Sequence, residues 1–341
     1  MADISSNSVD DLNAGAGSSG AYFREQLLDR RAQLAAIPGL GEREDFRTLL
    51  REVDLALERL DTRAYGTCEN CHDPIQPRRL LKDPLTRVCL GCLSETQQRA
   101  LEYDLELAAA VQKALLPPER VRTRGWEIEH RYRPLGPVSG DYCDVLRPDA
   151  PDAPMQFVLG DVSGKGVSAS ILVAHLQAVF RSLASLELPL ADLAARANSI
   201  FCEATLSNSF STSLLGRLFP DGTLEICNAG HCPPLLLRGG EATQLAATGL
   251  PLGLFCRSAF QVARFRLMKG DALFLYTDGL SEATNRSGEQ FGTERVEAIA
   301  RRLNGQPAGL ALEGCLDDLD EFQGGVARED DLTVMMVRRS G

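Results

Sequence analysis

Four short segments of the sequence place aspartates beside apolar runs. The segments are "GDYCDV", "FVLGDVSGKG", "LFLYTDGL" and "DDLTVMMV", and they carry Asp141, Asp161, Asp278 and the pair Asp330 and Asp331. A lone aspartate at a strand end is usually a cap or a turn residue. Several aspartates beside strands of one core would repel one another, and hard divalent cations compensate such repulsion. The pattern therefore predicts a metal site, in which two ions about 3.5–4 Å apart would activate water and polarise a phosphoryl group.

The glycine-rich segment around Asp161, "GDVSGKG", does not match a nucleotide-binding loop. A Walker-type loop needs four residues between its glycines, but only three separate Gly160 from Gly164, and Gly166 stands where a hydroxyl is required. The dinucleotide fingerprint G-x-G-x-x-G is absent as well. Lys165 in this segment is a candidate phosphate contact, and its alternative is a solvated loop lysine.

Four cysteines form a second group, in "CENCHDPIQPRRLLKDPLTRVCLGC". Cys68 and Cys71 make one C-x2-C pair, and Cys89 and Cys92 make another, seventeen residues later. Two such pairs complete a tetrahedral four-cysteine site with no open position, which predicts a structural zinc ion. The alternatives are unligated reduced cysteines and a redox pair, and the second correctly spaced pair argues against both. His72 is a rival ligand that we expect to face solvent.

The other six cysteines are predicted to be small, reduced core residues. They are Cys143, Cys202, Cys227, Cys232, Cys256 and Cys315. One of them lies in "HCPPLLLR", which has the H-C-x5-R spacing of a cysteine-dependent phosphatase. That chemistry needs loop N–H groups around the phosphate and a thiolate of low pKa. Two consecutive prolines remove donors and the leucines predict a strand, so we expect no catalytic role for Cys232.

The composition is that of a globular protein, with 44% hydrophobic and 24% charged residues in a chain of 341. The net charge of −11 argues against direct DNA binding through bulk electrostatics. No apolar run approaches the ~20 residues of a membrane span, and residues 1–20 lack the apolar core of a signal peptide. We therefore expect a cytoplasmic protein without membrane contact.

Apolar periodicity predicts the elements that position these groups. Residues 22–60 carry two helical stripes interrupted by "PGLG", which predicts a helical hairpin. Residues 94–116 predict a further helix, either a dimerising coiled coil or a packed connector. Its expected seam consists of Leu101, Leu105, Ala108 and Leu115, with Gln112 inside it.

From Trp126 onward, short strands recur between helices, which favours a layered α+β domain. "WEIEHRYR" predicts a half-buried strand. Further strands are expected at 142–146, 155–160, 213–219, 223–228, 234–238, 262–267, 271–277 and 332–338. Helices are expected at 167–186, 190–206 and 293–303.

The segment 62–95 resembles the DksA/TraR-type zinc finger through "YGTCENC", an I-x-x-R-R-L stretch and the second C-x2-C pair. The resemblance implies a four-cysteine zinc site packed against helices. In that family the hairpin enters a channel of RNA polymerase, so contact with RNA polymerase is a hypothesis here. The hairpin in this chain is short, and its turn lacks a matching acidic motif.

Five ordered motifs make residues 107–338 resemble the SpoIIE/RsbU branch of the PPM metal-dependent serine/threonine protein phosphatases. They are "GDYCDV", "GDVSGKG", "NAGHCPP", "LYTDGLSEATN" and "DDLTV". The resemblance implies two packed β-sheets flanked by helices, with two Mn2+ or Mg2+ ions at one end. By motif, Asp161 bridges both ions, helped by the backbone carbonyl of Val162. The other carboxylates come, directly or through water, from Asp141, Asp278 and Asp330, with Asp331 left open.

The implied reaction is in-line attack of a metal-bridging hydroxide on phosphoserine or phosphothreonine. Eukaryotic-type relatives carry a proposed general-acid histidine two residues after the bridging aspartate, where this chain has Ser163, so the general acid is open. Asn228, Gly230 and His231 are expected to shape a turn. The implied substrate is a phosphorylated protein, an anti-sigma-factor antagonist of a bacterial partner-switching pathway.

Together these patterns predict an α+β protein with a PPM-type β-sandwich flanked by helices. We divide it into a disordered lead-in (1–20), a helical hairpin with a zinc finger (21–93), a connector helix (94–118) and a phosphatase domain (119–341). For the connector helix, a homodimer contact and a packed connector both stay open. The alternatives are a non-catalytic scaffold and an RNA-polymerase-associated regulator acting through the zinc module. The intact aspartate set argues against the scaffold.

Overall fold

The computed structural model describes residues 18–35, 44–147, 153–205 and 209–341. The chain divides into two compact units, Met1–Glu102 and Tyr103–Gly341. The turn of the expected hairpin lies outside the described residues, as does the lead-in before Ser18. Helix begins at Ser18, inside the segment that the sequence assigns to the lead-in.

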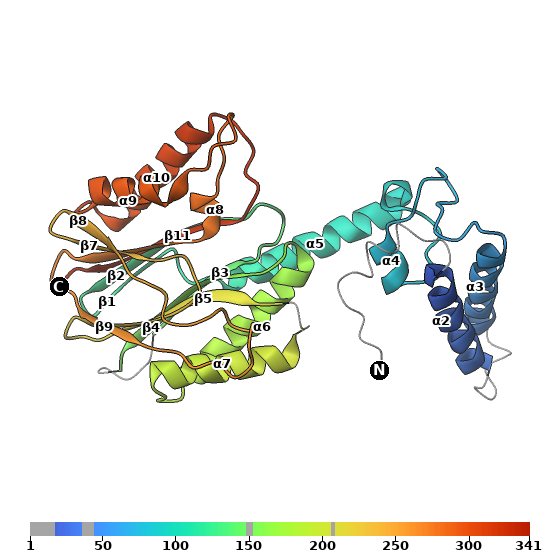
Figure 1. Cartoon of the computed structure of the whole chain (residues 1–341), viewed down its shortest axis with the longest axis horizontal. Helices are drawn as coiled ribbons and strands as arrows, with labels where there is room; N and C mark the ends of the chain where they lie inside the picture. The colour runs from blue at the N-terminus through green and yellow to red at the C-terminus, as the bar shows by residue number, and fades with distance from the viewer. Residues whose placement is uncertain (1–17, 36–43, 148–152, 206–208) are drawn as a thin grey trace. The chain divides into compact units, whose positions relative to one another are not determined.

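The first unit contains the predicted helical hairpin beside the cysteine segment (Figure 1). Its helices are α2 (Ser18–Ala35) and α3 (Glu44–Asp61). Leu27 and Val53 are fully buried between them, and Arg31 Nε donates to Asp54 Oδ1 at 2.6 Å. The short helix α4 (Pro77–Lys82) and a 3-10 turn, Leu90–Cys92, lie within the cysteine segment.

Helix α5 (Glu95–Leu115) begins with a capping box, in which Ser94 and Gln97 exchange hydrogen bonds. The predicted seam is not its most exposed apolar face. Tyr103, Leu107 and Val111 form an i, i+4, i+8 stripe with 66%, 54% and 54% of their surfaces exposed. The exposed stripe differs from the predicted seam because the side of α5 that carries Gln112 is buried against the second unit, where Gln112 bonds to Ser139.

Two antiparallel sheets stack in the second unit (Figure 1). The first has the order β1-β2-β11-β10-β7-β8, with strands at Arg120–Thr123, Trp126–Arg133, Leu332–Arg339, Ala272–Tyr276, Leu235–Arg238 and Glu241–Gln244. The second has the order β3-β4-β5-β6-β9, with strands at Asp141–Leu146, Met155–Val162, Ser211–Leu218, Thr223–Ala229 and Ala263–Arg266.

Helices cover the outer faces of both sheets (Figure 1). Helices α6 (Val167–Ala184) and α7 (Leu190–Ala204) pack on the five-stranded sheet. Helices α9 (Gly292–Leu303) and α10 (Ala308–Gln323) pack on the six-stranded sheet, and the short α8 (Asp278–Ser281) follows β10. The predicted α+β sandwich flanked by helices is therefore confirmed.

Side-chain alternation along the strands separates three apolar cores. In β10, Leu273 and Leu275 lie between the sheets, whereas Phe274 and Tyr276 pack toward α9 and α10. Because the side-chain period of a strand is two, the next residue in phase with the inner set, Thr277, also points between the sheets. This alternation of side chains along β10 determines which polar residues point into the space between the sheets at the end of the sandwich.

Helix α6 qualifies by length and composition as a membrane span, which the sequence analysis did not expect. Its side chains Val173, Leu176 and Phe180 are buried against the five-stranded sheet. Core helices pass the same test, and this packing identifies α6 as a core helix.

Helix α10 and the four-residue strands β1 and β8 were not predicted. Helix α10 carries Gly309 and Gly314 in its interior, and glycine there weakens a helical pattern. Both glycines are explained by close packing. A Cβ at Gly309 would lie 2.5 Å from Glu129 Oε2, and one at Gly314 would lie 3.3 Å from Leu303 Cδ2.

The strand β2 is more buried than the predicted half-buried strand. Glu127 and Glu129 are 5% exposed, and α10 packs over this face of the sheet. Arg120 compensates both carboxylates, with contacts of 2.6 and 2.8 Å. Charged residues in an alternating pattern can therefore be buried when arginines on a neighbouring strand pair with them.

The prediction of six reduced core cysteines is wrong for one pair. Cys143, Cys227 and Cys315 are buried, as expected, but Cys202 and Cys256 form a disulfide, and Cys256 is exposed. The two residues are 54 positions apart in the sequence. The packing of α7 against the segment before β9 brings them together, and no local pattern indicates this contact.

Candidate active site and metal centres

One end of the sandwich gathers the predicted aspartates. Asp141 begins β3 and stands directly opposite Asp161 near the end of β4. Opposed residues of an antiparallel pair point to the same face. Both aspartates are in phase with Cys143 and Leu159, which lie in the core between the sheets. The two carboxylates therefore point into the same space between the sheets.

The facing sheet brings its acids to the same end. Asp278 follows β10, and Asp330 and Asp331 precede β11, which pairs with β10. The backbone N–H of Thr277 donates to the carbonyl of Thr333 at 3.0 Å and continues this pairing. The acids of both sheets interact electrostatically, and Asp278 and Asp330 are the strongest charged neighbours of Asp161.

Two threonines of the six-stranded sheet hold Asp141 from across the sandwich. The hydroxyls of Thr277 and Thr333 donate to Asp141 Oδ2 at 2.9 and 2.6 Å. The backbone N–H of Thr333 donates to the Thr277 hydroxyl at 2.9 Å and orients it. Asp141 is 2% exposed, so these bonds fix its carboxylate in a buried position.

Oxygen atoms converge beside Gly140. A Cβ at this position would lie 2.9 Å from the Val162 carbonyl oxygen, 3.1 Å from Asp161 Oδ1 and 3.3 Å from the Gly164 carbonyl oxygen. A larger residue would fill this space. Carboxylate and carbonyl oxygens are the donors that Mg2+ and Mn2+ prefer, so the residues present fit the predicted ions.

Burial and mutual repulsion raise the pKa values of these acids. The pKa of Asp161 is raised to about 7, chiefly by burial and further by repulsion from the charges of Asp278 and Asp330. Burial is the main cause that raises the pKa of Asp141 well above its ordinary value, and repulsion from Asp161 adds to it. Burial, together with repulsion from Asp330, also raises the pKa of Asp278. Nearby cations would relieve this repulsion and favour the ionised forms.

The aspartates do not form a compact group of three or more ligand atoms among the described residues. Among the described residues, only the four clustered cysteines form a group of at least three whose ligand atoms all lie within 4.8 Å of one another. A cation beside Asp161 would therefore complete its shell with backbone oxygens or water. Mg2+ commonly keeps several waters in this way.

The neighbouring residues Asp330 and Asp331 have different surroundings. Asp331 is 6% exposed, and its two carboxylate oxygens accept hydrogen bonds from the backbone N–H groups of Leu135 and Gly140 at 2.7 and 2.8 Å. Asp330 has a side chain that is 43% exposed and pairs with Lys165 Nζ at 3.0 Å. Asp331 thus anchors the segment that leads into Asp141, whereas Asp330 faces the open side of the cluster.

Hydrogen bonds hold the segment after Asp161 and the turn at the end of β6 in place. The Ser163 hydroxyl accepts a hydrogen bond from the Phe210 N–H at 3.0 Å. Asn228 Oδ1 accepts from the His231 N–H at 2.8 Å, and Asn228 Nδ2 donates to the His231 carbonyl. These bonds and the positive φ of Gly230 confirm the prediction that Asn228, Gly230 and His231 shape a turn. His231 is buried, and its Nδ1 lies 2.9 Å from the Thr212 hydroxyl.

Cys232 lacks the surroundings of a catalytic thiol. Burial raises its pKa to about 12, and nearby carboxylates act in the same direction. The leucines after the two prolines form β7, as predicted. A thiol of raised pKa beside anions is a poor nucleophile for phosphate.

A glutamine of α5 is linked to the acidic site, which the sequence analysis missed. Gln112 is 8% exposed and makes two hydrogen bonds to the backbone of Ser139, at 2.8 and 2.9 Å. The Ser139 hydroxyl in turn accepts from the Asp141 N–H at 3.0 Å. A polar residue within an apolar helical seam was the available signal. Its partner could not be derived from periodicity.

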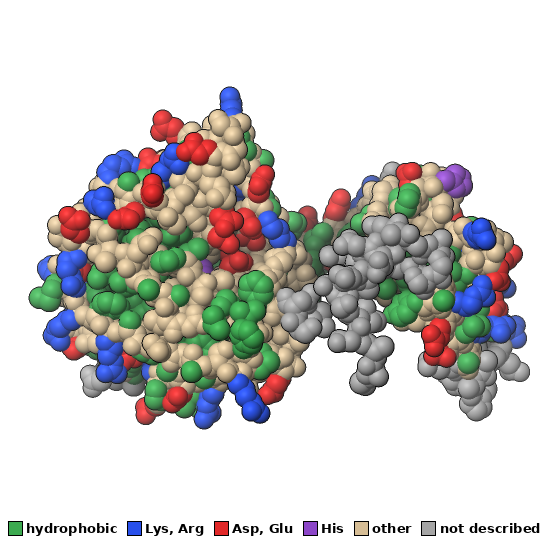
Figure 2. Space-filling model, in the orientation of Figure 1, with side chains coloured by type: hydrophobic (Ala, Val, Ile, Leu, Met, Phe, Trp, Pro, Cys, Tyr) green, Lys and Arg blue, Asp and Glu red, His purple; other side chains and the backbone are tan. Residues whose placement is uncertain are grey.

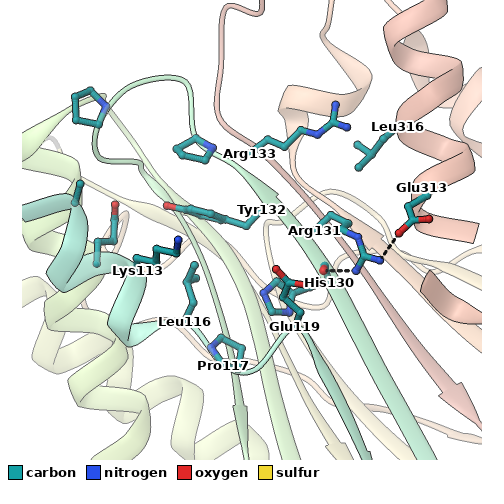
Figure 3. Close-up of a pocket in the computed structure, with 14 residues that line it drawn as sticks. Lys113, Leu116, Pro117, Glu119, His130, Arg131, Tyr132, Arg133, Glu313 and Leu316 are labelled. Carbon is teal, nitrogen blue, oxygen red and sulfur yellow. Dashed lines mark hydrogen bonds and ion pairs between the residues drawn. The ribbon is translucent and has the colours of Figure 1, made fainter. Parts of the chain in front are cut away.

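A cavity of about 600 Å³ lies between the end of α5, β2 and α10 (Figure 3). Figure 3 shows Lys113, Tyr132 and His130 at its wall, with Arg131 paired to Glu313 at 2.8 Å. Tyr132 stands opposite Thr333 in the sheet, and Thr333 is one of the two threonines that hold Asp141. The cavity thus adjoins the residues that support the acidic site.

The four cysteines of the first unit converge as predicted. The Sγ atoms of Cys68, Cys71, Cys89 and Cys92 all lie within 4.8 Å of one another. The backbone N–H of Cys71 lowers the pKa of the Cys68 thiol to about 6, whereas the pKa values of Cys71 and Cys92 are raised among these crowded thiols, and a bound cation would favour the thiolate form of all of them. Thiolate ligands are what a four-cysteine zinc site requires. His72 is exposed, as expected.

Removing one cysteine ligand tests the zinc centre. We expect purified protein to hold one zinc per chain and Cys89→Ser to lose it, with protease sensitivity appearing within the first unit. Structural zinc supplies much of the folding free energy of such small units. Metal analysis and limited proteolysis are the measurements, and His72→Ala is the control. Zinc retained in Cys89→Ser, or lost in His72→Ala, would contradict this ligand set.

Removing a hydroxyl that holds Asp141 tests the link between the two sheets. Thr333→Val keeps the shape of the side chain but removes one of the two donors. We expect Mn2+ affinity to fall roughly 10–100-fold, as for other groups that orient metal ligands. Titration calorimetry measures this, with Thr243→Val on the exposed edge strand β8 as the control. Equal Mn2+ affinity in both variants would argue against an orienting role.

Burial of His231 makes a pH-dependent contribution to stability. Burial lowers its pKa from 6.5 to about 4, so the unfolded chain binds the proton first as the pH falls. Stability is therefore lost below about pH 6.5, by about 2 kcal/mol at pH 5. Urea unfolding at pH 8 and pH 5 should show a loss larger by about this amount in wild type than in His231→Asn. Equal losses in the two proteins would contradict the buried, neutral state.

Comparisons with known proteins agree with the fold and the motifs. The family model described as Stage II sporulation protein E (SpoIIE) matches residues 151–340, and the prokaryotic dksA/traR C4-type zinc finger model matches residues 63–98.

Among curated relatives, Protein IcfG of Synechocystis is 25% identical over 72% of this chain and 43% of its own length. The phosphoserine phosphatase RsbU of Bacillus subtilis is 23% identical over 71% of this chain and 72% of its own. The chain thus spans less than half of the first relative.

The SiaA-PP2C domain of Pseudomonas aeruginosa superimposes with a TM-score of 0.62 and 20% identity, over 72% of this chain and 99% of that domain. The likeness shows that the second unit has the PP2C fold. The SpoIIE model covers more than half of the chain, and the chain therefore belongs to the SpoIIE family, with a dksA/traR C4 zinc finger before the family domain.

Proposed function

We propose that the second unit is a metal-dependent protein phosphatase that hydrolyses phosphoserine or phosphothreonine. The observation that carries the proposal is the meeting of carboxylates from two facing sheets at one end of the sandwich. Asp141 and Asp161 come from one sheet, and Asp278 and Asp330 from the ends of strands in the other. Membership of the SpoIIE family and a relative named as a phosphoserine phosphatase support the same activity.

We assign the metal ligands from this geometry. Asp161, Asp278 and Asp330, the Val162 carbonyl and the second oxygen of Asp141 would hold two Mn2+ or Mg2+ ions. Bound there, the ions would supply an activated water and positive charge for the phosphoryl oxygens. Asp331 acts as a positioning residue, because both of its oxygens hold backbone N–H groups.

The chain's own residues then orient and neutralise the site. Thr277 and Thr333 fix Asp141 from the opposite sheet. Lys165 lies at the open side of the cluster, where its ammonium group pairs with Asp330 and can reach a bound phosphate after that pair opens. The Ser163 hydroxyl is tied to Phe210, so we propose that solvent supplies the proton to the leaving oxygen.

The substrate that fits this family is a phosphorylated protein. We propose an anti-sigma-factor antagonist of a partner-switching pathway, and a cytoplasmic location, on the strength of the resemblance to RsbU. The exposed stripe of Tyr103, Leu107 and Val111 supports a homodimer through α5. Contact of the zinc unit with RNA polymerase stays a hypothesis.

Hydrolysis assays test the proposed activity. We expect Mn2+-dependent turnover of p-nitrophenyl phosphate and of a phosphoserine protein, which chelator abolishes. Asp278→Asn should lower kcat at least roughly 100-fold, because it removes a ligand charge from the cluster. Asp320→Asn, in an exposed ion pair on α10, is the matched control and should retain activity, as should Cys232→Ser.

Two results would contradict the proposal. Loss of turnover in Cys232→Ser would indicate cysteine chemistry. A folded protein that binds no Mn2+ and hydrolyses neither compound would favour the non-catalytic scaffold.

A further inference from the structure

We propose that an exposed apolar surface beside the acidic site binds the folded part of the phosphoprotein substrate that surrounds its phosphoserine. We call it the docking surface. It consists of Val167, Ile171, Phe210, Leu254 and Phe255. The inference rests on the proposed phosphatase function and adds where, and through which contacts, the protein substrate is held.

The docking surface is unusual in its exposure. Ile171 and Phe255 expose 63% and 59% of their surfaces, and Val167, Leu254 and Phe210 expose between 37% and 46%. Single exposed apolar side chains are ordinary, but a contiguous group marks an interaction site. Figure 2 shows hydrophobic side chains gathered on this face, directly beside a group of acidic ones.

Hydrogen bonds place one half of the docking surface next to the metal ligands. Ser163 follows Val162, and it exchanges two hydrogen bonds with Phe210, at 2.9 and 3.0 Å. Helix α6 begins at Val167, four residues after Ser163. Ile171 lies one turn further along, on the same face of that helix. Phe210 and the first turns of α6 therefore border the acidic site.

The other half comes from the segment before β9. Leu252 and Ser211 exchange two backbone hydrogen bonds of 2.8 Å, and Ser211 stands opposite Val162 in the five-stranded sheet. Leu254 and Phe255 follow Leu252 by two and three residues. This segment therefore reaches the same corner of the sandwich as Phe210.

The segment that carries Phe255 is held in place by α7. Asn198 Nδ2 donates to the Phe255 carbonyl at 2.9 Å, and Asn198 Oδ1 accepts from the Gly253 N–H at 2.8 Å. The disulfide between Cys202 and Cys256 fastens the segment a second time. A surface that is already ordered loses little conformational entropy when a partner binds.

The position of the docking surface beside the acidic site indicates which protein binds there. A protein that delivers a phosphoserine to Asp161 must cover the residues around Ser163, because these border the acidic cluster. The phosphoester itself gains nothing from apolar contacts, whereas a folded domain with apolar side chains around its phosphoserine buries them here. We therefore assign the surface to the phosphoprotein substrate, rather than to a second copy of this chain.

Kinetics with substrates of different size test the assignment. The probes are p-nitrophenyl phosphate, a short phosphoserine peptide, and a folded anti-sigma-factor antagonist carrying the same phosphoserine. We expect Ile171→Glu and Phe255→Glu to lower kcat/KM for the folded phosphoprotein at least 10-fold and to leave p-nitrophenyl phosphate turnover within about 2-fold. The peptide, which is too short to cover the surface, should behave like p-nitrophenyl phosphate.

Met268→Glu is the matched control. Met268 is 64% exposed and lies before β10, at the end of that strand away from Asp278, so this variant should match wild type on all three probes. Equal losses on small and large probes in Ile171→Glu and Phe255→Glu would overturn the proposal in favour of a structural role. Unchanged phosphoprotein kinetics together with a changed oligomeric state would assign the surface to a second copy of the chain.

A binding measurement separates this inference from the proposed function. Fluorescence anisotropy gives the Kd of the folded phosphoprotein for the Asp278→Asn protein, with and without Phe255→Glu. We expect the added substitution to weaken binding at least 10-fold. If wild type hydrolyses no probe, the proposed function fails, and this binding difference still decides whether the surface docks the phosphoprotein. An unchanged Kd would refute docking even in an active enzyme.

Discussion

Mutual repulsion among carboxylates at one end of the sandwich is the constraint on which the rest of the site depends. Asp141 and Asp161 are forced together by strand pairing, and the facing sheet adds Asp278 and Asp330. Such a group is stable only if cations, hydroxyls or an ammonium compensate it. The chain supplies Thr277, Thr333 and Lys165 for this purpose, and the remaining charge favours bound metal.

This constraint also explains why the surrounding elements are tied to the site. Gln112 of α5 holds Ser139, and Ser139 holds the backbone of Asp141. A shift of α5 would therefore reach Asp141, which we propose as a metal ligand, through the hydrogen bonds of Gln112 and Ser139. Coupling of this kind needs a physical chain of contacts, and the structure provides one between the helix and the acidic site.

The sequence was most informative where a local rule decides the outcome. Strand periodicity and motif order located the sandwich and the aspartates, and C-x2-C spacing located the cysteine cluster. Tertiary contacts decided the rest. Helix α10 was missed because glycines that fit against β2 and α9 resemble helix breakers, and the Cys202–Cys256 disulfide joins segments that no local pattern connects. Asp330 and Asp331 differ in their surroundings because the segment that contains Leu135 covers Asp331, whereas Asp330 pairs with Lys165.

Metal binding by the acidic cluster is the central claim, and anomalous X-ray diffraction tests it most directly. Crystals grown with Mn2+ and measured at the manganese absorption edge would locate the ions without assuming any activity. We expect two manganese peaks between the sheets, both within reach of Asp161. Manganese absent from this end of the sandwich, with the aspartates ordered as described, would contradict the claim.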